Sequence, residues 1–310
     1  MRAGGSSSTW SKTSTSSSTP DPGAPRPASA PAPERWVRAA RVIHPFPSLL
    51  DAVATATFVA LAGGAPLTAA SLAAAMFCLQ ASIGSANDVV DATADREAKP
   101  TKPIPAGLVS LRAATSVALV AGFGGLTLAA LHGPAVLLVA LMGYGIGLVY
   151  DLRLKRTPWS WLAYALALPL VPAFAWLGSG AGLPPRFPIL VALALLAGTG
   201  LAVANGLVDL EGDVATGTAG VAGVLGRHRA LGVVVGCDAA MIVMAVATAS
   251  STGAPSSPAW LVVATGALVC VAGAGLSAGR IEWQRRLGWE LQAVAIALVA
   301  VGWFALQPAA

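Results

Sequence analysis

The polar stretch from Asn87 to Gly107 interrupts a chain that is otherwise mostly apolar. Within it, Asp88, Asp91 and Asp95 are spaced i, i+3 and i+7, so on a helix their carboxylates lie on one face. Three like charges on one face repel each other, and a divalent cation is the usual agent that offsets this repulsion. Carboxylate oxygens suit Mg²⁺, which commonly completes its coordination with substrate phosphates. The spacing therefore predicts a Mg²⁺ site.

A second acidic segment repeats this pattern later in the chain. Residues 204–213, ANGLVDLEGD, align without gaps on residues 86–95, ANDVVDATAD. An internal repeat in a membrane chain predicts two related half-bundles with a shared site where they meet. The alternative, a solvated helix end outside the membrane, explains one such segment more easily than two in matching positions.

Both segments resemble signatures of the UbiA-type intramembrane prenyltransferases. The first signature is matched by Asn87 with the three aspartates and by the run KPIPAG at 102–107, the second by DxxxD at 209–213 with Gly217 and the Leu-Gly pair at 225–226. The resemblance covers about residues 35–306. It implies transfer of a prenyl group from a polyprenyl diphosphate to a lipophilic, aromatic acceptor. An allylic carbocation would form a C–C bond with that acceptor.

Electrostatics and the resemblance together predict roles for individual side chains. Metal ions that neutralise a diphosphate help it depart as an anion, and cationic side chains can hold it. An aromatic ring stabilises a carbocation through its face. The predicted metal ligands are Asn87, Asp91, Asp95, Asp209 and Asp213; the predicted diphosphate contacts are Asn87, Lys102, Lys155, Arg156 and Asn205; the predicted catalytic residues are Asp88, Asp95, Tyr150 and Lys155.

Two features leave alternatives open. Anchoring at the cytoplasmic face explains Lys155 and Arg156 as well as diphosphate binding does. Many relatives carry a basic residue after the position of Asp213, and residues 214–226 contain none. We therefore expect a weaker second diphosphate-binding arm.

The composition predicts a polytopic helical membrane protein. Of 310 residues, 55% are hydrophobic and 11% are charged, whereas soluble domains carry about a quarter charged residues. The net charge of +5 does not indicate nucleic-acid binding, because most basic residues lie in short loops between apolar segments. An all-α bundle of nine membrane spans around a central cavity is expected, at roughly 46–63, 67–86, 111–131, 134–150, 159–178, 187–205, 229–250, 258–279 and 289–306.

The basic residues also predict the orientation of the bundle in the cell membrane. With the N-terminus inside, fifteen Lys and Arg residues near the spans fall on the cytoplasmic side and only Arg186 on the other. Both acidic segments fall on the cytoplasmic side, so we expect the site to open there. The fifteen are Arg35, Arg38, Arg41, Arg96, Lys99, Lys102, Arg112, Arg153, Lys155, Arg156, Arg227, Arg229, Arg280, Arg285 and Arg286.

The chain divides into a tail and one membrane domain. Residues 1–33 are rich in Ser, Thr, Pro and Ala and are predicted to be disordered, and residues 34–310 form the UbiA-like domain.

Asp51 and Asp238 lie within predicted spans, where a carboxylate faces the bundle interior by default. Asp51 follows His44 by seven residues, so the two could share a helix face in an acceptor pocket. A structural carboxylate explains Asp51 equally well.

Rival functions share these features. On the same scaffold, the prenyl diphosphate could be cyclised without a second substrate, or transferred to a non-aromatic acceptor. A secondary transporter also combines internal repeats with intramembrane acids, and Mg²⁺-dependent release of pyrophosphate would exclude it. Membrane lipids surround the protein in every case. The donor chain length, the acceptor and the oligomeric state stay open at this stage.

Overall fold

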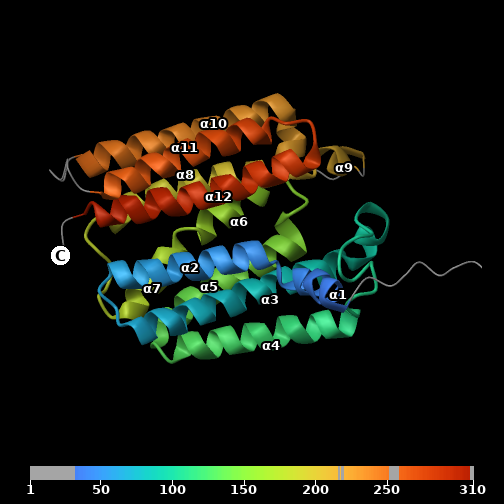
Figure 1. The fold of residues 1–310 in the computed structure, drawn as a ribbon, viewed down its shortest axis with the longest axis horizontal. Coiled ribbons are helices and arrows are strands. Elements are labelled where there is room, and N and C mark those ends of the chain that lie inside the picture. The colour runs from blue at the N-terminus through green and yellow to red at the C-terminus, as the bar shows by residue number, and fades with distance from the viewer. Residues whose placement is uncertain (1–31, 216, 218–219, 251–257, 308–310) are drawn as a thin grey trace, which may run out of the picture.

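A computed structural model describes residues 32–215, 217, 220–250 and 258–307. The long helices run roughly parallel to one another and form an elongated bundle (Figure 1). The described residues contain no strand. The helices are α1 (Ala32–Ala39), η1 (Ala40–Ile43), α2 (Pro45–Leu61), α3 (Pro66–Ala98), α4 (Leu111–Ala130), α5 (Pro134–Val149), the π-helix η2 (Tyr150–Leu154), α6 (Ser160–Ala167), α7 (Leu170–Ser179), α8 (Phe187–Val208), α9 (Leu210–Ala215), α10 (Val221–Ser250), α11 (Ala259–Ser277) and α12 (Glu282–Ala305).

The predicted all-α polytopic fold is confirmed. Among the described residues, eight helical segments are long and apolar enough to cross a membrane. A ninth is added when Glu34–Ile43 and Pro45–Leu61, which meet at a 62° bend, count as one span. The predicted tail, residues 1–33, lies outside the described residues except for Ala32 and Pro33, which begin α1.

Proline and serine residues set several helix starts. Pro45, Pro66, Pro134 and Pro188 lie in the first turns of their helices, where the missing N–H needs no partner. The hydroxyl of Ser110 accepts a hydrogen bond from the backbone N of Ala113 and caps α4. These caps fix where the chain enters each apolar segment.

The fifth predicted span, 159–178, corresponds to Ser160–Ser179. Inside it, α6 and α7 are separated at Pro169, because proline cannot supply the backbone donor of a continuous helix. Two other predicted boundaries are wrong. The second span was predicted to end at residue 86, but its helix continues to Ala98, so the first acidic segment lies on α3 itself. The seventh span begins at Val221 rather than 229, with a non-helical kink at Gly226.

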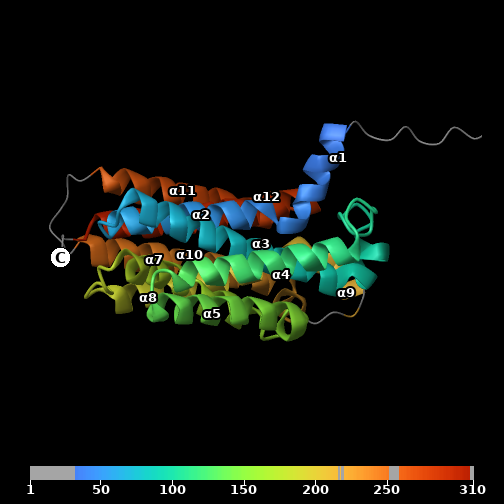
Figure 2. The same ribbon diagram turned by 90° about the horizontal axis from the view of Figure 1, so that it is seen from below.

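The bundle consists of two groups of helices. In Figure 1, α2, α3, α4, α5 and α7 lie on one side, and α8, α10, α11 and α12 on the other. Helix α3 packs on α2 and α4, α8 packs on α10 and α6, and α12 contacts both α8 and α2. The two acidic segments lie at the same end of the bundle, where α9 and the segment after α3 project (Figures 1 and 2).

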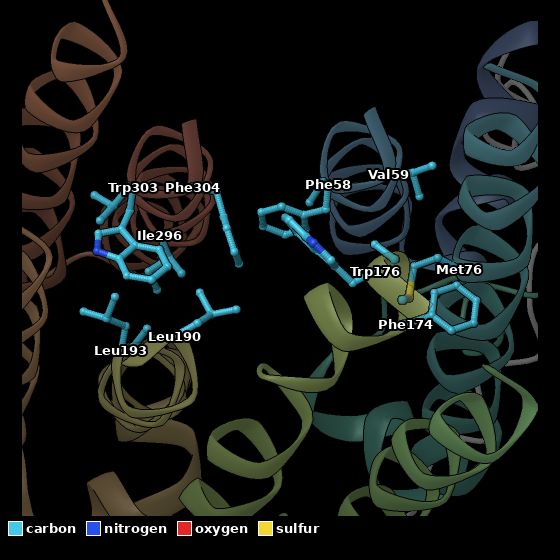
Figure 3. Close-up of a cluster of buried hydrophobic side chains, with 14 of the residues drawn as sticks. Phe58, Val59, Met76, Phe174, Trp176, Leu190, Leu193, Ile296, Trp303 and Phe304 are labelled. Carbon is cyan, nitrogen blue, oxygen red and sulfur yellow. The ribbon is translucent and has the colours of Figure 1, made fainter. Parts of the chain in front are cut away.

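Aromatic side chains join the two groups of helices at the opposite end. Trp176 of α7 stacks on Phe304 of α12 with ring centroids 4.2 Å apart, and Phe58 of α2 meets the same Phe304 edge-on at 5.6 Å. Figure 3 shows these rings facing one another between the helices, with Leu190, Leu193 and Ile296 nearby. This aromatic contact packs α2 and α7 against α12 at the end of the bundle away from the acidic segments.

Small residues allow α11 and α12 to approach closely, as is common in membrane bundles. A Cβ added at Gly288 would lie 2.6 Å from the backbone N of Ser277. Gly288→Ala should therefore force the two helices apart and lower the free energy of unfolding by about 1–3 kcal/mol.

Thermal unfolding of the purified protein in detergent measures this effect. Gly275→Ala is the matched control, because a Cβ added at Gly275 meets nothing within 4 Å. The control should leave the unfolding midpoint unchanged or slightly higher. Equal midpoints for the two variants would contradict this account of the packing.

Candidate active site

The first acidic segment presents its carboxylates on one buried face of α3. Asp88, Asp91 and Asp95 are 3%, 7% and 6% exposed, which agrees with their helical spacing. Buried carboxylates are costly unless each one is paired. Each of the three has a basic partner brought in by another segment of the chain.

Lys102 neutralises two of these carboxylates. Its Nζ donates to Asp88 Oδ1 at 2.9 Å and to Asp95 Oδ2 at 2.7 Å. The chain turns back after α3 through Gly107, whose φ of +69° favours glycine. Partial burial alone would lower the pKa of Lys102, but the carboxylates of Asp88 and Asp95 outweigh it and raise the pKa above its ordinary value. Lys102 is therefore cationic here.

Asp91 is paired from the other side of the site. The Nζ of Lys155 donates to Asp91 Oδ2, and Nη2 of Arg156 donates to Asp91 Oδ1 at 3.1 Å. Both basic residues follow η2, which closes with a hydrogen bond from the backbone N of Lys155 to the carbonyl of Tyr150. The structure thus brings two of the five predicted diphosphate contacts, Lys155 and Arg156, onto the predicted metal ligand Asp91.

His44 is a further partner of Asp88, whereas the sequence analysis placed it beside Asp51. It has a left-handed backbone (φ 48°, ψ 68°) at the break before α2, and its Nε2 lies 3.2 Å from Asp88 Oδ1. The predicted shared helix face of His44 and Asp51 is wrong, because His44 precedes the helix and turns toward α3. Asp51 instead accepts a hydrogen bond from Gln80.

Asn87 and Tyr150 lie beside this cluster. Asn87 Nδ2 donates to Asp151 Oδ1 at 2.7 Å, while Asp151 Oδ2 is buried without a hydrogen-bond partner in the described structure. The hydroxyl of Tyr150 shares hydrogen bonds with Asn205 and Tyr164. Asp151, the residue after Tyr150, therefore adds to this cluster a buried oxygen without a hydrogen-bond partner among the described residues. The sequence analysis gave Asp151 no role.

A salt bridge joins the two acidic segments directly. Nζ of Lys99, at the end of α3, donates to Asp209 Oδ2, at the end of α8, at 2.6 Å. The second segment lacks a basic residue of its own after Asp213, and Lys99 supplies one from the first half of the chain. Asp213 lies in α9, and its side chain is outside what the structure describes.

Basic side chains balance the acids in this structure. Among the described residues, no three His, Cys, Asp or Glu side chains gather as a metal site. The donor chemistry nevertheless suits Mg²⁺, because the carboxylates and the Asn87 amide are hard oxygen ligands. The unpartnered Asp151 Oδ2 beside Asn87 provides a further oxygen.

The segment around Glu211 turns away from this cluster. Arg285 is 3% exposed, and its Nε and Nη2 donate to the carbonyl of Val208 at 3.3 and 3.1 Å. Arg285 also pairs with Glu211, which accepts from Arg227 Nη1 at 3.0 Å. This network fixes the turn that carries Asp209. The sequence analysis counted these arginines only as loop charges, since their spacing gives no sign of their partners.

An apolar cavity lies between the two groups of helices. Its empty volume is about 730 Å³, part of it open at the surface. Residues of α2, α7, α8 and α12 line it, together with Leu168 and Met241. Asp51 is the one polar side chain in this lining. The interior therefore combines a charged cluster at one end with an apolar space suited to hydrocarbon.

These features define a polytopic membrane protein with a charged site at one end of an apolar interior. The sequence profile of the UbiA prenyltransferase family matches residues 52–297, and the chain belongs to that family.

Two named relatives share part of the sequence. The digeranylgeranylglyceryl phosphate synthase of Pyrococcus abyssi is 32% identical over 146 residues, which cover 46% of this chain and 52% of the relative. The chloroplastic chlorophyll synthase of Avena sativa is 29% identical over 171 residues, which cover 51% and 45%. The chain thus spans about half the length of the curated relatives it matches.

Solved structures share the fold. A UbiA homologue from Aeropyrum pernix K1 superimposes with a TM-score of 0.68 at 20% identity, over 82% of this chain and 96% of that chain. A UbiA homologue from Archaeoglobus fulgidus bound to GPP and Mg²⁺ gives a TM-score of 0.64 at 18% identity, over 87% and 99%. At these identities the likeness concerns the fold alone.

The Arg285 network yields a stability prediction. Arg285→Gln removes a buried cation from the Val208 carbonyl and from Glu211, and should lower the free energy of unfolding by about 1–3 kcal/mol. Arg286→Gln is the neighbouring control, since Arg286 is exposed and its pair with Glu282 lies on the helix surface. That control should change stability by less than about 0.5 kcal/mol. Thermal unfolding of both proteins measures this, and equal losses would contradict the anchoring role of Arg285.

Proposed function

We propose that this chain is an integral membrane prenyltransferase that moves a prenyl group from a polyprenyl diphosphate to a lipophilic acceptor. The observation that carries the proposal is the salt bridge between Lys99 and Asp209. It joins two acidic segments at one end of an apolar cavity. A prenyl diphosphate has the same division into a charged head and a hydrocarbon chain. The family and the names of the two relatives support the same reaction class.

Mg²⁺ belongs to this proposal as the cofactor. Its proposed ligands are Asn87, Asp91, Asp95, Asp209 and Asp213, and when bound it neutralises the diphosphate and so helps it depart. A relative with the same fold is described as bound to GPP and Mg²⁺. The lysines that now pair with the carboxylates would exchange partners when substrate binds.

The chain's own residues bind and position the donor. We assign Lys102, Lys155 and Arg156 to the departing diphosphate, because charge-assisted hydrogen bonds from cations to phosphate oxygens are strong. Asn205 holds the Tyr150 hydroxyl, and we assign the ring face of Tyr150 to stabilise positive charge on the prenyl carbon. The apolar cavity holds the prenyl chain, and the bound chain shields the reactive carbon from water and so limits its hydrolysis.

The acceptor class has two candidates within this proposal. The resemblance favours an aromatic acceptor, whereas the relatives named digeranylgeranylglyceryl phosphate synthase favour a non-aromatic one. We also propose that the site opens to the cytoplasmic side of the cell membrane, on the strength of the basic-residue asymmetry.

If the two acidic segments act on one diphosphate, neither can activate it alone. Asp91→Asn and Asp209→Asn should each lower turnover by orders of magnitude. The double variant should be little worse than the poorer single variant, because residues that act as a unit are not additive. The assay is Mg²⁺-dependent release of pyrophosphate from prenyl diphosphates of several chain lengths by membranes that contain each variant, since the membranes also supply the lipophilic acceptor. A transporter would release no pyrophosphate.

Glu97→Gln provides the control within the first segment. Glu97 is exposed at the end of α3, so this variant should keep near-native release. Near-native release by either aspartate variant, or losses that multiply in the double variant, would contradict a single shared site.

A further inference from the structure

The cavity between the two groups of helices holds one polar side chain in an apolar lining. Asp51 of α2 faces this space among residues such as Leu50, Phe58, Leu193 and Ile296. A carboxyl group inside the hydrocarbon region is costly unless it has a partner or a task. The diphosphate proposal gives Asp51 no task, because it lies outside both acidic segments.

Gln80 forms a hydrogen bond with one of the two oxygens of the Asp51 carboxyl group. Its Nε2, on α3, donates to Asp51 Oδ2. Within the described part of the chain, the structure records no hydrogen bond to the second oxygen, Oδ1. The amide thus fixes the orientation of the carboxyl group and leaves an oxygen able to accept from a molecule in the cavity.

The position of this pair defines which part of a substrate it would meet. Gln80 lies about two helical turns before Asp88 on α3, roughly 12 Å along the helix axis. The pair is therefore deeper in the bundle than the groups assigned to the diphosphate. It would meet the lipophilic body of a substrate and not its leaving group.

We propose that Asp51 and Gln80 form a recognition site for a hydrogen-bond donor, such as an alcohol or phenol hydroxyl, on the lipophilic acceptor. This inference rests on the proposed function for naming the acceptor as the ligand. An apolar body fills the cavity, and its hydroxyl donates to Asp51. A ligand that lacks the hydroxyl leaves the carboxyl oxygen desolvated and unpaired, which weakens its binding. The pair is then a determinant of specificity and also a link between α2 and α3.

The test compares two probes of nearly the same shape, 4-dodecylphenol and 4-dodecylanisole, which differ in the hydroxyl donor. Binding to purified protein in phosphatidylcholine nanodiscs is measured by tryptophan fluorescence, with empty nanodiscs correcting for partition into lipid. We expect the phenol to bind about tenfold more tightly or better, because the anisole leaves the Asp51 oxygen desolvated and without a hydrogen-bond partner. Asp51→Ala should abolish this preference and still bind the anisole.

Two further variants keep the test decisive. Asp51→Asn preserves shape and a bond to Gln80 and should reduce the preference several-fold, which gives a result even if Asp51→Ala fails to fold. Asp238→Asn, a buried carboxyl outside the cavity lining, should keep the full preference. Equal binding of the two probes by the unmodified protein, or an unchanged preference in both Asp51 variants, would overturn the inference.

This outcome is separate from that of the proposed function. A hydroxyl preference without Mg²⁺-dependent consumption of any prenyl diphosphate by membranes that contain the protein would refute the transferase and leave the recognition site standing. Pyrophosphate release without a hydroxyl preference would refute the recognition site alone.

Discussion

The buried carboxylates at the end of α3 impose the constraint on which the rest of the site depends. Three aspartates on one face of a helix, each less than a tenth exposed, cannot stay ionised without nearby cations. The chain meets this need from separate segments. Lys102 returns from the turn after α3, Lys155 and Arg156 reach over from the end of η2, and His44 turns in from the break before α2. Lys99 extends the pairing to Asp209 and so holds the two halves of the bundle together at this end.

The same ion pairs also explain how the site could bind a metal ion and an anionic substrate. Carboxylates and cations that neutralise each other are already placed where a metal ion and an anionic head group would need them. Binding both would exchange one set of charge partners for another without leaving any charge unpaired. The apolar cavity lies between the two groups of helices, and the stacked rings of Trp176 and Phe304 join the two groups at the end of the bundle opposite the acidic segments. Arg285 keeps the turn that carries Asp209 in place through the carbonyl of Val208.

Periodicity predicted the elements well and their long-range partners poorly. The spacing of Asp88, Asp91 and Asp95 placed them on one helix face, and the repeat placed both acidic segments at one end of the bundle. Hydropathy predicted the spans but gave no sign that the helix of the second span continues past residue 86 to Ala98, because that extension is polar. Asp88 and Asp209 are paired by residues that follow α3 or precede α2, and the course of the chain there decides which residues meet. Residue spacing within a helix does not predict that course. For the same reason, Glu211 was indistinguishable by sequence from the aspartates on either side.

The most direct test of this account is incubation of membranes containing the protein with radiolabelled prenyl diphosphates of several chain lengths, followed by lipid extraction and product analysis. The account predicts Mg²⁺-dependent transfer of the label into a larger lipid product, with one pyrophosphate released for each prenyl group transferred. No Mg²⁺-dependent consumption of any donor, or a cyclised prenyl product formed from the donor alone, would contradict it.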